Sequence, residues 1–98
     1  MTAQEVLARL REHEAQLRAQ GVTRAALFGS LARGEARPDS DIDLFLDIDP
    51  DARVSLWGLV GIVQFLEDMF PSKIDVSERG SLRPHVRPSA ERDAIYAF

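Results

Sequence analysis

The sequence of 98 residues contains no cysteine. Disulfide frameworks and zinc sites built from cysteine are therefore excluded, which fits a protein of the reducing cytoplasm. Long hydrophobic runs are also missing, because the apolar stretch at residues 56–70 is too short and too interrupted to span a bilayer. The first residues, M-T-A-Q-E-V-L, are polar and amphipathic and do not resemble a signal peptide. We therefore expect a cytoplasmic protein without a membrane segment.

Basic residues are the minority among the charges: 12 lysines and arginines stand against 16 acidic residues, and the net charge is −4. General nucleic-acid binding needs a basic face that displaces counterions, so that class of function is disfavoured. A nucleoside triphosphate is not excluded, because Mg²⁺ can neutralise its charge locally. A chain of this length makes one domain, residues 1–98, with few residues left for substrate selection. A partner or an oligomer, of identical or different chains, can complete the site.

The most informative stretch joins a glycine–serine turn to an acidic triplet. An apolar run ends in Gly29-Ser30, ten residues intervene, and Asp41-Ile42-Asp43 opens a second apolar run. If residues 41–47 are extended, Asp41 and Asp43 point to the same face, roughly 6–7 Å apart along the backbone. Two adjacent carboxylates repel each other unless a divalent cation lies between them. The turn, with its backbone N–H groups and hydroxyl, suits a phosphate.

Hydrophobic periodicity and turn residues predict the remaining elements. An amphipathic helix is expected over Thr2–Gln20, with Thr2 and Glu5 at capping-box spacing, and a helix apolar nearly all round over Leu56–Phe70. The second helix has two apolar faces. One face can cover a sheet, and the other face must pack against another helix or another chain. The other predicted elements are strands at 22–28, 41–48 and 72–77, one helical turn at 30–34, and a final helix at 80–98.

A third carboxylate, Asp75, lies on the strand predicted after the apolar helix. If that strand neighbours the Asp41–Asp43 strand and Asp75 faces the same side, three carboxylates converge to bind one or two metal ions, and Asp75 can orient or deprotonate an attacking hydroxyl. Taken alone, each piece has a simpler explanation as a solvated strand end or an ordinary turn. Arg33 and Ser40 can contact phosphate oxygens, or can equally be a solvated loop residue and a turn-shaping residue.

The stretch G-S-L-A-R-G-E-A-R-P-D-S-D-I-D-L resembles the signature of the DNA polymerase β nucleotidyltransferase superfamily, and the compact chain resembles its smallest branch, the minimal nucleotidyltransferase (MNT) domain. The resemblance implies an α/β (α+β) fold with a small mixed sheet flanked by helices. It also implies transfer of a nucleoside monophosphate from a triphosphate to a hydroxyl with two Mg²⁺ ions. On the same basis Asp41, Asp43 and Asp75 would bind metal, and Gly29 and Ser30 would hold phosphate.

The resemblance further implies a role. Many MNT proteins are antitoxins of type VII toxin–antitoxin pairs, which neutralise a HEPN-domain ribonuclease toxin by transferring AMP from ATP to one of its tyrosines. Two alternatives stay open. One is a binding module that blocks the toxin sterically without catalysis. The other is transfer to a small molecule such as an aminoglycoside, although enzymes of that kind usually carry a further substrate domain.

Overall fold

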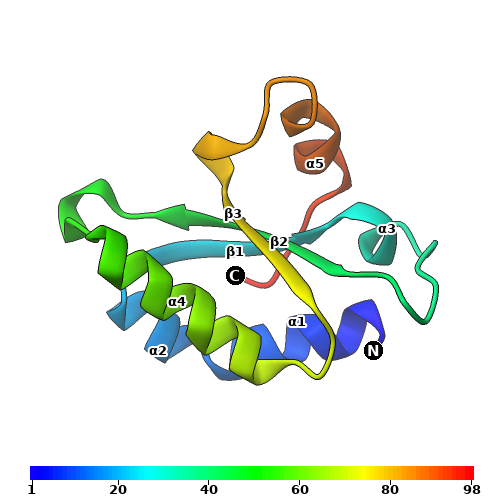
Figure 1. Ribbon diagram of the computed structural model, residues 1–98, viewed down its shortest axis with the longest axis horizontal. Coiled ribbons are helices and arrows are strands. Elements are labelled where there is room, and N and C mark those ends of the chain that lie inside the picture. Colours follow the sequence, from blue (N-terminus) through cyan, green and yellow to red (C-terminus); the bar gives the residue numbers. More distant parts are fainter.

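The computed structural model describes all residues, 1–98, and is built on a four-stranded sheet in the order β3-β2-β1-β4 (Figure 1). The strand β1 is antiparallel to β2 and to β4, whereas β2 and β3 are parallel. The expected small mixed sheet with flanking helices is confirmed. The strands are β1 (Val22–Phe28), β2 (Ile42–Ile48), β3 (Ile74–Glu78) and β4 (Ile95–Tyr96); the helices are α1 (Ala3–Glu12), α2 (Glu14–Ala19), α3 (Gly29–Ala32), α4 (Leu56–Met69) and α5 (Arg87–Asp93), with short 3-10 turns η1 (Pro50–Ala52) and η2 (Arg79–Ser81).

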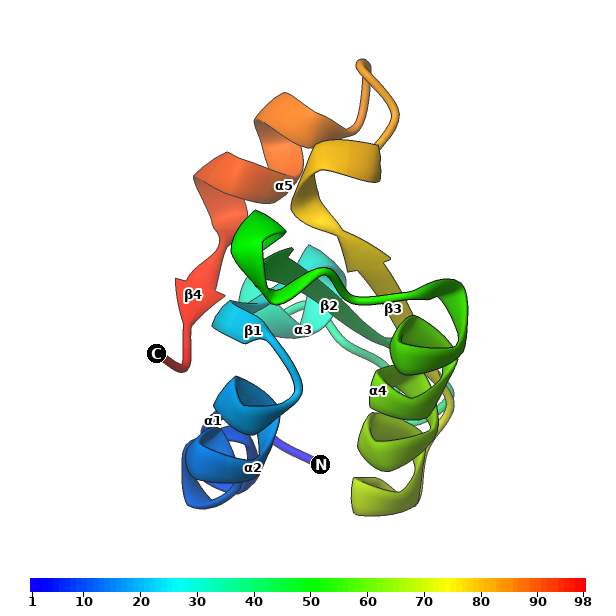
Figure 2. The ribbon, with the colours of Figure 1, turned by 90° about the vertical axis from the view of Figure 1, so that its left-hand side faces the viewer.

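Helices cover both faces of the sheet (Figure 2): α1, α2 and α4 lie on one side and α5 on the other. Strand alternation in β2 divides its side chains between them. Ile42, Leu44 and Leu46 are buried in the main core under α1, α2 and α4. Phe45 packs instead with Ala90 of α5 in a smaller cluster. The face that carries Phe45 is therefore also the face that carries Asp43.

The N-terminal helix is interrupted, so the expected continuous helix Thr2–Gln20 is wrong in that respect. His13 has φ −107° and ψ 16°, outside the helical range, and separates α1 from α2. Its ring Nδ1 lies 2.9 Å from the carbonyl oxygen of Arg9, and the ring packs edge-on against Phe65 of α4. The predicted capping box of Thr2 and Glu5 is confirmed, with both reciprocal hydrogen bonds formed.

The C-terminal segment differs most from the expected helix Gly80–Phe98. Only residues 87–93 are α-helical, with Pro88 in the first turn, where a missing N–H costs nothing. The chain then forms β4, which pairs antiparallel with the edge of β1 through Ala26–Tyr96 and Leu27–Ile95. An unpaired edge of β1 would leave its backbone groups open, and two residues of β4 cover part of it.

The helix α4 uses only part of its apolar surface as core. Ile62 and Leu66 are buried, and Leu59 is half-buried. Leu56 and Trp57 are 73% and 82% exposed and Val60 is 51% exposed, so no element of this chain covers the first turns of α4. The sequence left open which apolar face of this helix covers the sheet, and the structure presents Ile62 and Leu66 to it. None of the helices combines the length and apolar character needed to span a lipid bilayer.

Candidate active site

The site begins where β1 passes into α3 at Gly29. This residue has φ +76°, and a Cβ added there would lie 2.3 Å from Oδ2 of Asp43. A side chain of any kind would collide with that carboxylate. Because glycine has no side chain, the backbone of the bend can lie directly against Asp43. Ser30 follows in the first turn of α3. The structure thus brings the predicted phosphate-binding turn against the predicted metal-binding strand.

Two of the predicted carboxylates are paired across neighbouring strands. Asp43 of β2 lies in register with Asp75 of β3. Residues in register on adjacent strands project to the same face. Ile74 and Val76 pack on the main core, so Asp75 points with Asp43 toward the α5 side of the sheet. Asp41 precedes the first residue of β2, Ile42, so the strand begins one residue later than expected.

The Asp43 carboxyl lies in an environment that disfavours its ionised form. Burial raises the pKa of Asp43 above its ordinary value, and the negative charges of Asp75 and then Asp41 raise it further, while Arg33 opposes the shift. Desolvation and like-charge repulsion both disfavour the ionised form. Positive charge placed among these groups would relieve that cost. Lys73 supplies little of it, because its Nζ lies 4.0 Å from Asp41 and its side chain is largely exposed.

The donor set fits Mg²⁺ bound together with a phosphorylated ligand. As the side chains stand, no three His, Cys, Asp or Glu residues are grouped closely enough to hold a metal ion by themselves. Mg²⁺ seldom needs such a cage, because it keeps several waters and is usually bound by one or two carboxylates plus substrate phosphates. Asp43 and Asp75, side by side and next to the Gly29 bend, match that pattern.

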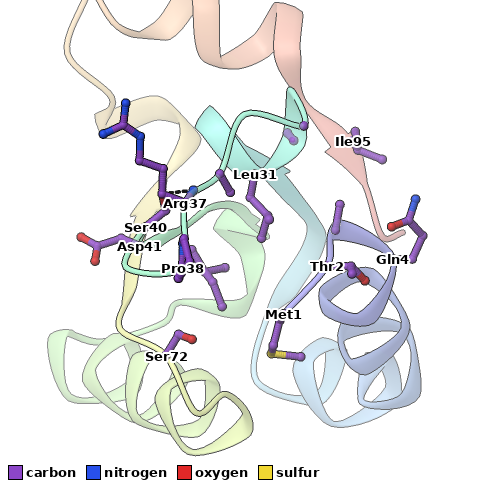
Figure 3. A pocket seen from close by; sticks show the side chains of 15 residues that line it. Met1, Thr2, Gln4, Leu31, Arg37, Pro38, Ser40, Asp41, Ser72 and Ile95 are labelled. Carbon is purple, nitrogen blue, oxygen red and sulfur yellow. Dashed lines mark hydrogen bonds between the residues drawn. The ribbon is translucent and has the colours of Figure 1, made fainter.

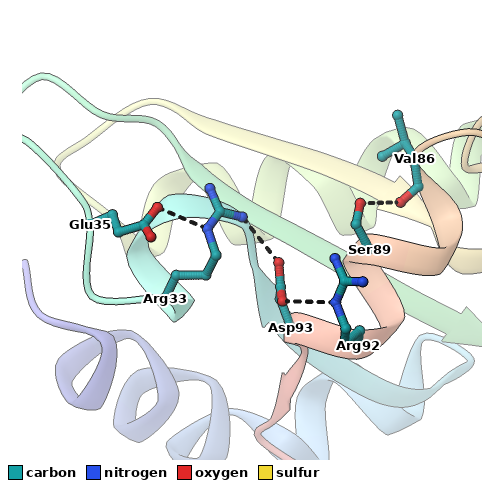
Figure 4. Close-up of polar contacts among 6 residues, drawn as sticks. All are labelled: Arg33, Glu35, Val86, Ser89, Arg92 and Asp93. Atoms are coloured by element: carbon teal, nitrogen blue, oxygen red, sulfur yellow. Dashed lines mark hydrogen bonds and ion pairs between the residues drawn. The ribbon is translucent and has the colours of Figure 1, made fainter.

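Arg33 and Ser40 have defined positions. The Arg33 guanidinium donates from Nε to Glu35 over 3.0 Å and from Nη1 to Asp93 over 3.1 Å (Figure 4). Ser40 accepts a hydrogen bond of 2.8 Å at its hydroxyl from the N–H of Arg37, which is the turn-shaping role. Sequence reasoning does not find Asp93, because it lies 60 residues from Arg33 and only the packing of α5 brings the two together.

A cavity of about 510 Å³ opens beside the site, between the start of α1 and the loop of residues 34–41 (Figure 3). Its wall is about half apolar and includes Met1, Leu31 and Pro38. It reaches the candidate site only at Ser40 and Asp41, and Asp43 and Asp75 lie outside its wall. The cavity is therefore separate from the pair Asp43 and Asp75, which lies on the α5 side of the sheet.

The raised pKa of Asp43 makes a stability prediction. A carboxyl whose pKa is higher in the folded than in the unfolded chain destabilises the fold once it ionises, and this cost grows as pH rises from the unfolded pKa through the folded pKa. Asp43→Asn is therefore expected to raise the free energy of unfolding at about pH 7 slightly, because solvent screens this partly exposed carboxyl and reduces the cost of ionising it. The gain should vanish below the ordinary Asp pKa of about 3.9.

Thermal melts of both proteins in EDTA across this pH range measure the difference. Asp39→Asn, in an exposed loop, is the control that removes one negative charge elsewhere. A wild-type chain that is more stable than Asp43→Asn at neutral pH would contradict the prediction.

Sequence comparison gives a family match over almost the whole chain: residues 7–97 match the model described as nucleotidyltransferase domain. The chain is 30% identical over 97 residues to protein adenylyltransferase MntA of Thermococcus cleftensis, covering 98% of this chain and 96% of the relative. A protein of Methanocaldococcus jannaschii, assigned as a protein adenylyltransferase, is 35% identical over 97 residues, with 97% of each chain covered.

Structural comparison agrees. A structure assigned as a minimal nucleotidyltransferase superposes with a TM-score of 0.79 and 30% identity, covering 97% of this chain and 95% of the other. A chain from a crystal structure of a toxin–antitoxin with AMP-PNP gives a TM-score of 0.63 at 21% identity, covering 90% of this chain and 72% of the other. At that identity the second match shows a shared fold.

Proposed function

The chain belongs to the nucleotidyltransferase domain family, and from this premise we propose that residues 1–98 form one domain that transfers AMP from ATP to a hydroxyl of a partner protein. The observation that carries the proposal is the contact of the Gly29 bend with Asp43, beside Asp75 in register. It places a turn suited to phosphate against carboxylates suited to Mg²⁺. The names of two relatives, both protein adenylyltransferases, support a protein acceptor.

Each of these residues has a separate role in the proposed nucleotidyl transfer. Gly29 and Ser30 hold the triphosphate, with Arg33 next to them. Asp41, Asp43 and Asp75 would hold Mg²⁺, which would neutralise phosphate charge and polarise the attacked phosphorus. Asp75 orients the acceptor hydroxyl and takes its proton as the oxygen attacks the α-phosphorus. The bond from the α-phosphorus to the bridging oxygen breaks in line, and pyrophosphate leaves.

The acceptor in this proposal is a tyrosine of a HEPN-domain toxin, and the chain is its antitoxin. The signature of residues 29–44 supports this through its resemblance to MNT antitoxins. The structural neighbours from toxin–antitoxin crystal structures share the fold. In such a pair the small domain supplies the nucleotide site and the toxin supplies the hydroxyl.

The direct test combines the chain with ATP, Mg²⁺ and the protein encoded by the neighbouring reading frame. Intact-mass spectrometry should show one or more added AMP groups on that protein, with release of pyrophosphate and loss of its toxicity. A partner that is fully neutralised but carries no AMP would refute the enzymatic version. Omitting ATP from an otherwise identical mixture is the matched control.

The competing function, steric neutralisation, is favoured by one observation: the first turns of α4 expose Leu56, Trp57 and Val60. The same surface serves an enzyme that must dock its protein substrate. Buried tryptophans often dominate interface energies. Trp57→Ala is therefore expected to weaken partner binding by about 10- to 100-fold. It should leave the rate of AMP transfer at saturating partner unchanged, since Trp57 lies on a helix across the sheet from Asp43.

Titration calorimetry with the partner measures this affinity. Gln16→Ala, an exposed position on α2, is the control and should bind like the wild type. Equal affinity of the Trp57→Ala and wild-type chains would place the docking surface elsewhere.

A further inference from the structure

The ion pair of Arg33 and Asp93 connects two elements that are remote in sequence. Arg33 follows the last residue of α3, directly after the phosphate-binding turn, and Asp93 is the last residue of α5. Nη1 of Arg33 lies 3.1 Å from Oδ2 of Asp93 (Figure 4). The Asp93 side chain is only 17% exposed, so the contact is shielded from solvent on the carboxylate side.

The geometry leaves donors of Arg33 available for a ligand. A guanidinium has five N–H donors in a planar fork. Asp93 takes Nη1 and Glu35 takes Nε, and the Nη2 amino group makes neither contact. The charge of Arg33 also reaches the carboxylate site, since it opposes the raised pKa of Asp43. Arg33 is thus held close to the Gly29 bend with part of its fork unused.

The two carboxylates that contact Arg33 differ in how firmly they can hold the orientation of its guanidinium. Glu35 lies two residues along the same loop and its side chain is 64% exposed. Exposed ion pairs of this kind fix geometry weakly, because solvent screens them and both side chains stay mobile. Asp93 is more enclosed and sits at the end of a helix packed on the sheet through the buried Ala90. The rigid member of the pair is therefore Asp93.

We infer that Asp93 is a positioning residue, which holds the Arg33 guanidinium toward the triphosphate at the Gly29–Ser30 bend and so makes α5 part of the nucleotide site. The inference rests on the proposed function and adds a residue to it. Asp93 touches no reacting atom in this scheme. It acts by setting where the Arg33 fork points, because a charge-assisted hydrogen bond fixes both distance and direction.

The test is nucleotide affinity, with AMP-PNP as the probe in calorimetry and the KM for ATP in the transfer assay. Asp93→Asn is expected to weaken AMP-PNP binding and raise KM by about 10-fold, with kcat changed by less than about 3-fold. Glu35→Gln, which removes the exposed carboxylate on the same guanidinium, should change either value by less than about 2-fold. Asp93→Glu keeps the charge and the fold but moves the carboxylate, and should give an intermediate KM.

A charge swap separates positioning from simple stabilisation. The double variant Arg33→Asp/Asp93→Arg restores an ion pair between α3 and α5 and should recover the melting temperature lost in Asp93→Asn. It should not recover AMP-PNP affinity, because the guanidinium then extends from the end of α5 and no longer from position 33 beside the Gly29–Ser30 bend. Recovered affinity in the swap, or wild-type affinity in Asp93→Asn, would overturn the inference alone. Failure of the wild-type chain to bind AMP-PNP would instead remove the proposed function and the inference together.

Discussion

Replacing Asp41 and Asp43 together by alanine is expected to lower the rate of AMP transfer by about 1,000-fold or more. Both carboxylates are proposed Mg²⁺ ligands, and the charge of Asp41 is one of the causes that raise the pKa of Asp43, after burial and the charge of Asp75. Without them the phosphate charge is unneutralised where the bond to pyrophosphate breaks, and electrostatic stabilisation is usually the largest catalytic contribution. The measurement is single-turnover transfer of labelled AMP to the partner.

This variant also separates the two proposed modes of neutralisation. An antitoxin that acts by AMP transfer loses protection with the double variant, whereas a steric antitoxin keeps it. The matched control is Asp39→Ala/Asp51→Ala, which removes two negative charges from exposed positions outside the site. Full protection by the Asp41→Ala/Asp43→Ala chain in a toxicity assay would rule out the catalytic mode.

Gly29→Ala is expected to reduce kcat/KM for ATP by about 100-fold or more. Its Cβ would lie 2.3 Å from Oδ2 of Asp43, too close for the two atoms to coexist, so the carboxylate or the bend must shift. Displacements near 1 Å in a site of this kind cost rates of about 100-fold. The φ of +76° adds backbone strain, which lowers stability by about 1–2 kcal/mol.

The control for Gly29→Ala is Gly34→Ala. Gly34 has nearly the same φ, +75°, but a Cβ there meets no atom within 4 Å. It therefore reproduces the backbone strain without the collision, and should lower the melting temperature while retaining activity within a few fold. Steady-state kinetics and thermal melts of the two variants make the comparison. Equal activities of the Gly29→Ala and Gly34→Ala chains would show that the contact with Asp43 is unimportant.

Local patterns in the sequence predicted most of the elements correctly. The strand Val22–Phe28 and the capping box at Thr2 follow from apolar runs and cap spacing that act over a few residues. The errors fall where distant contacts decide. The helix is interrupted at His13, where propensity would continue it, and the ring of His13 packs against Phe65 of α4. Residues 95–96 form a strand because the edge of β1 is available to them. Neither Phe65 nor the edge of β1 is visible in a local window.

The sequence alone determined the chemistry of the candidate site: the glycine–serine turn, the Asp41–Asp43 spacing with its period of two, and a later acidic residue on an apolar strand. These are properties of short segments, set by backbone geometry and side-chain type. Tertiary structure alone decided which of them meet. The parallel pairing of β2 and β3 put Asp75 beside Asp43, the bend at Gly29 closed against that carboxylate, and α5 brought Asp93 to Arg33. Such contacts depend on strand order and helix packing, which arise from burial of apolar surface across the whole chain. The local sequence around the contacting residues does not reveal them.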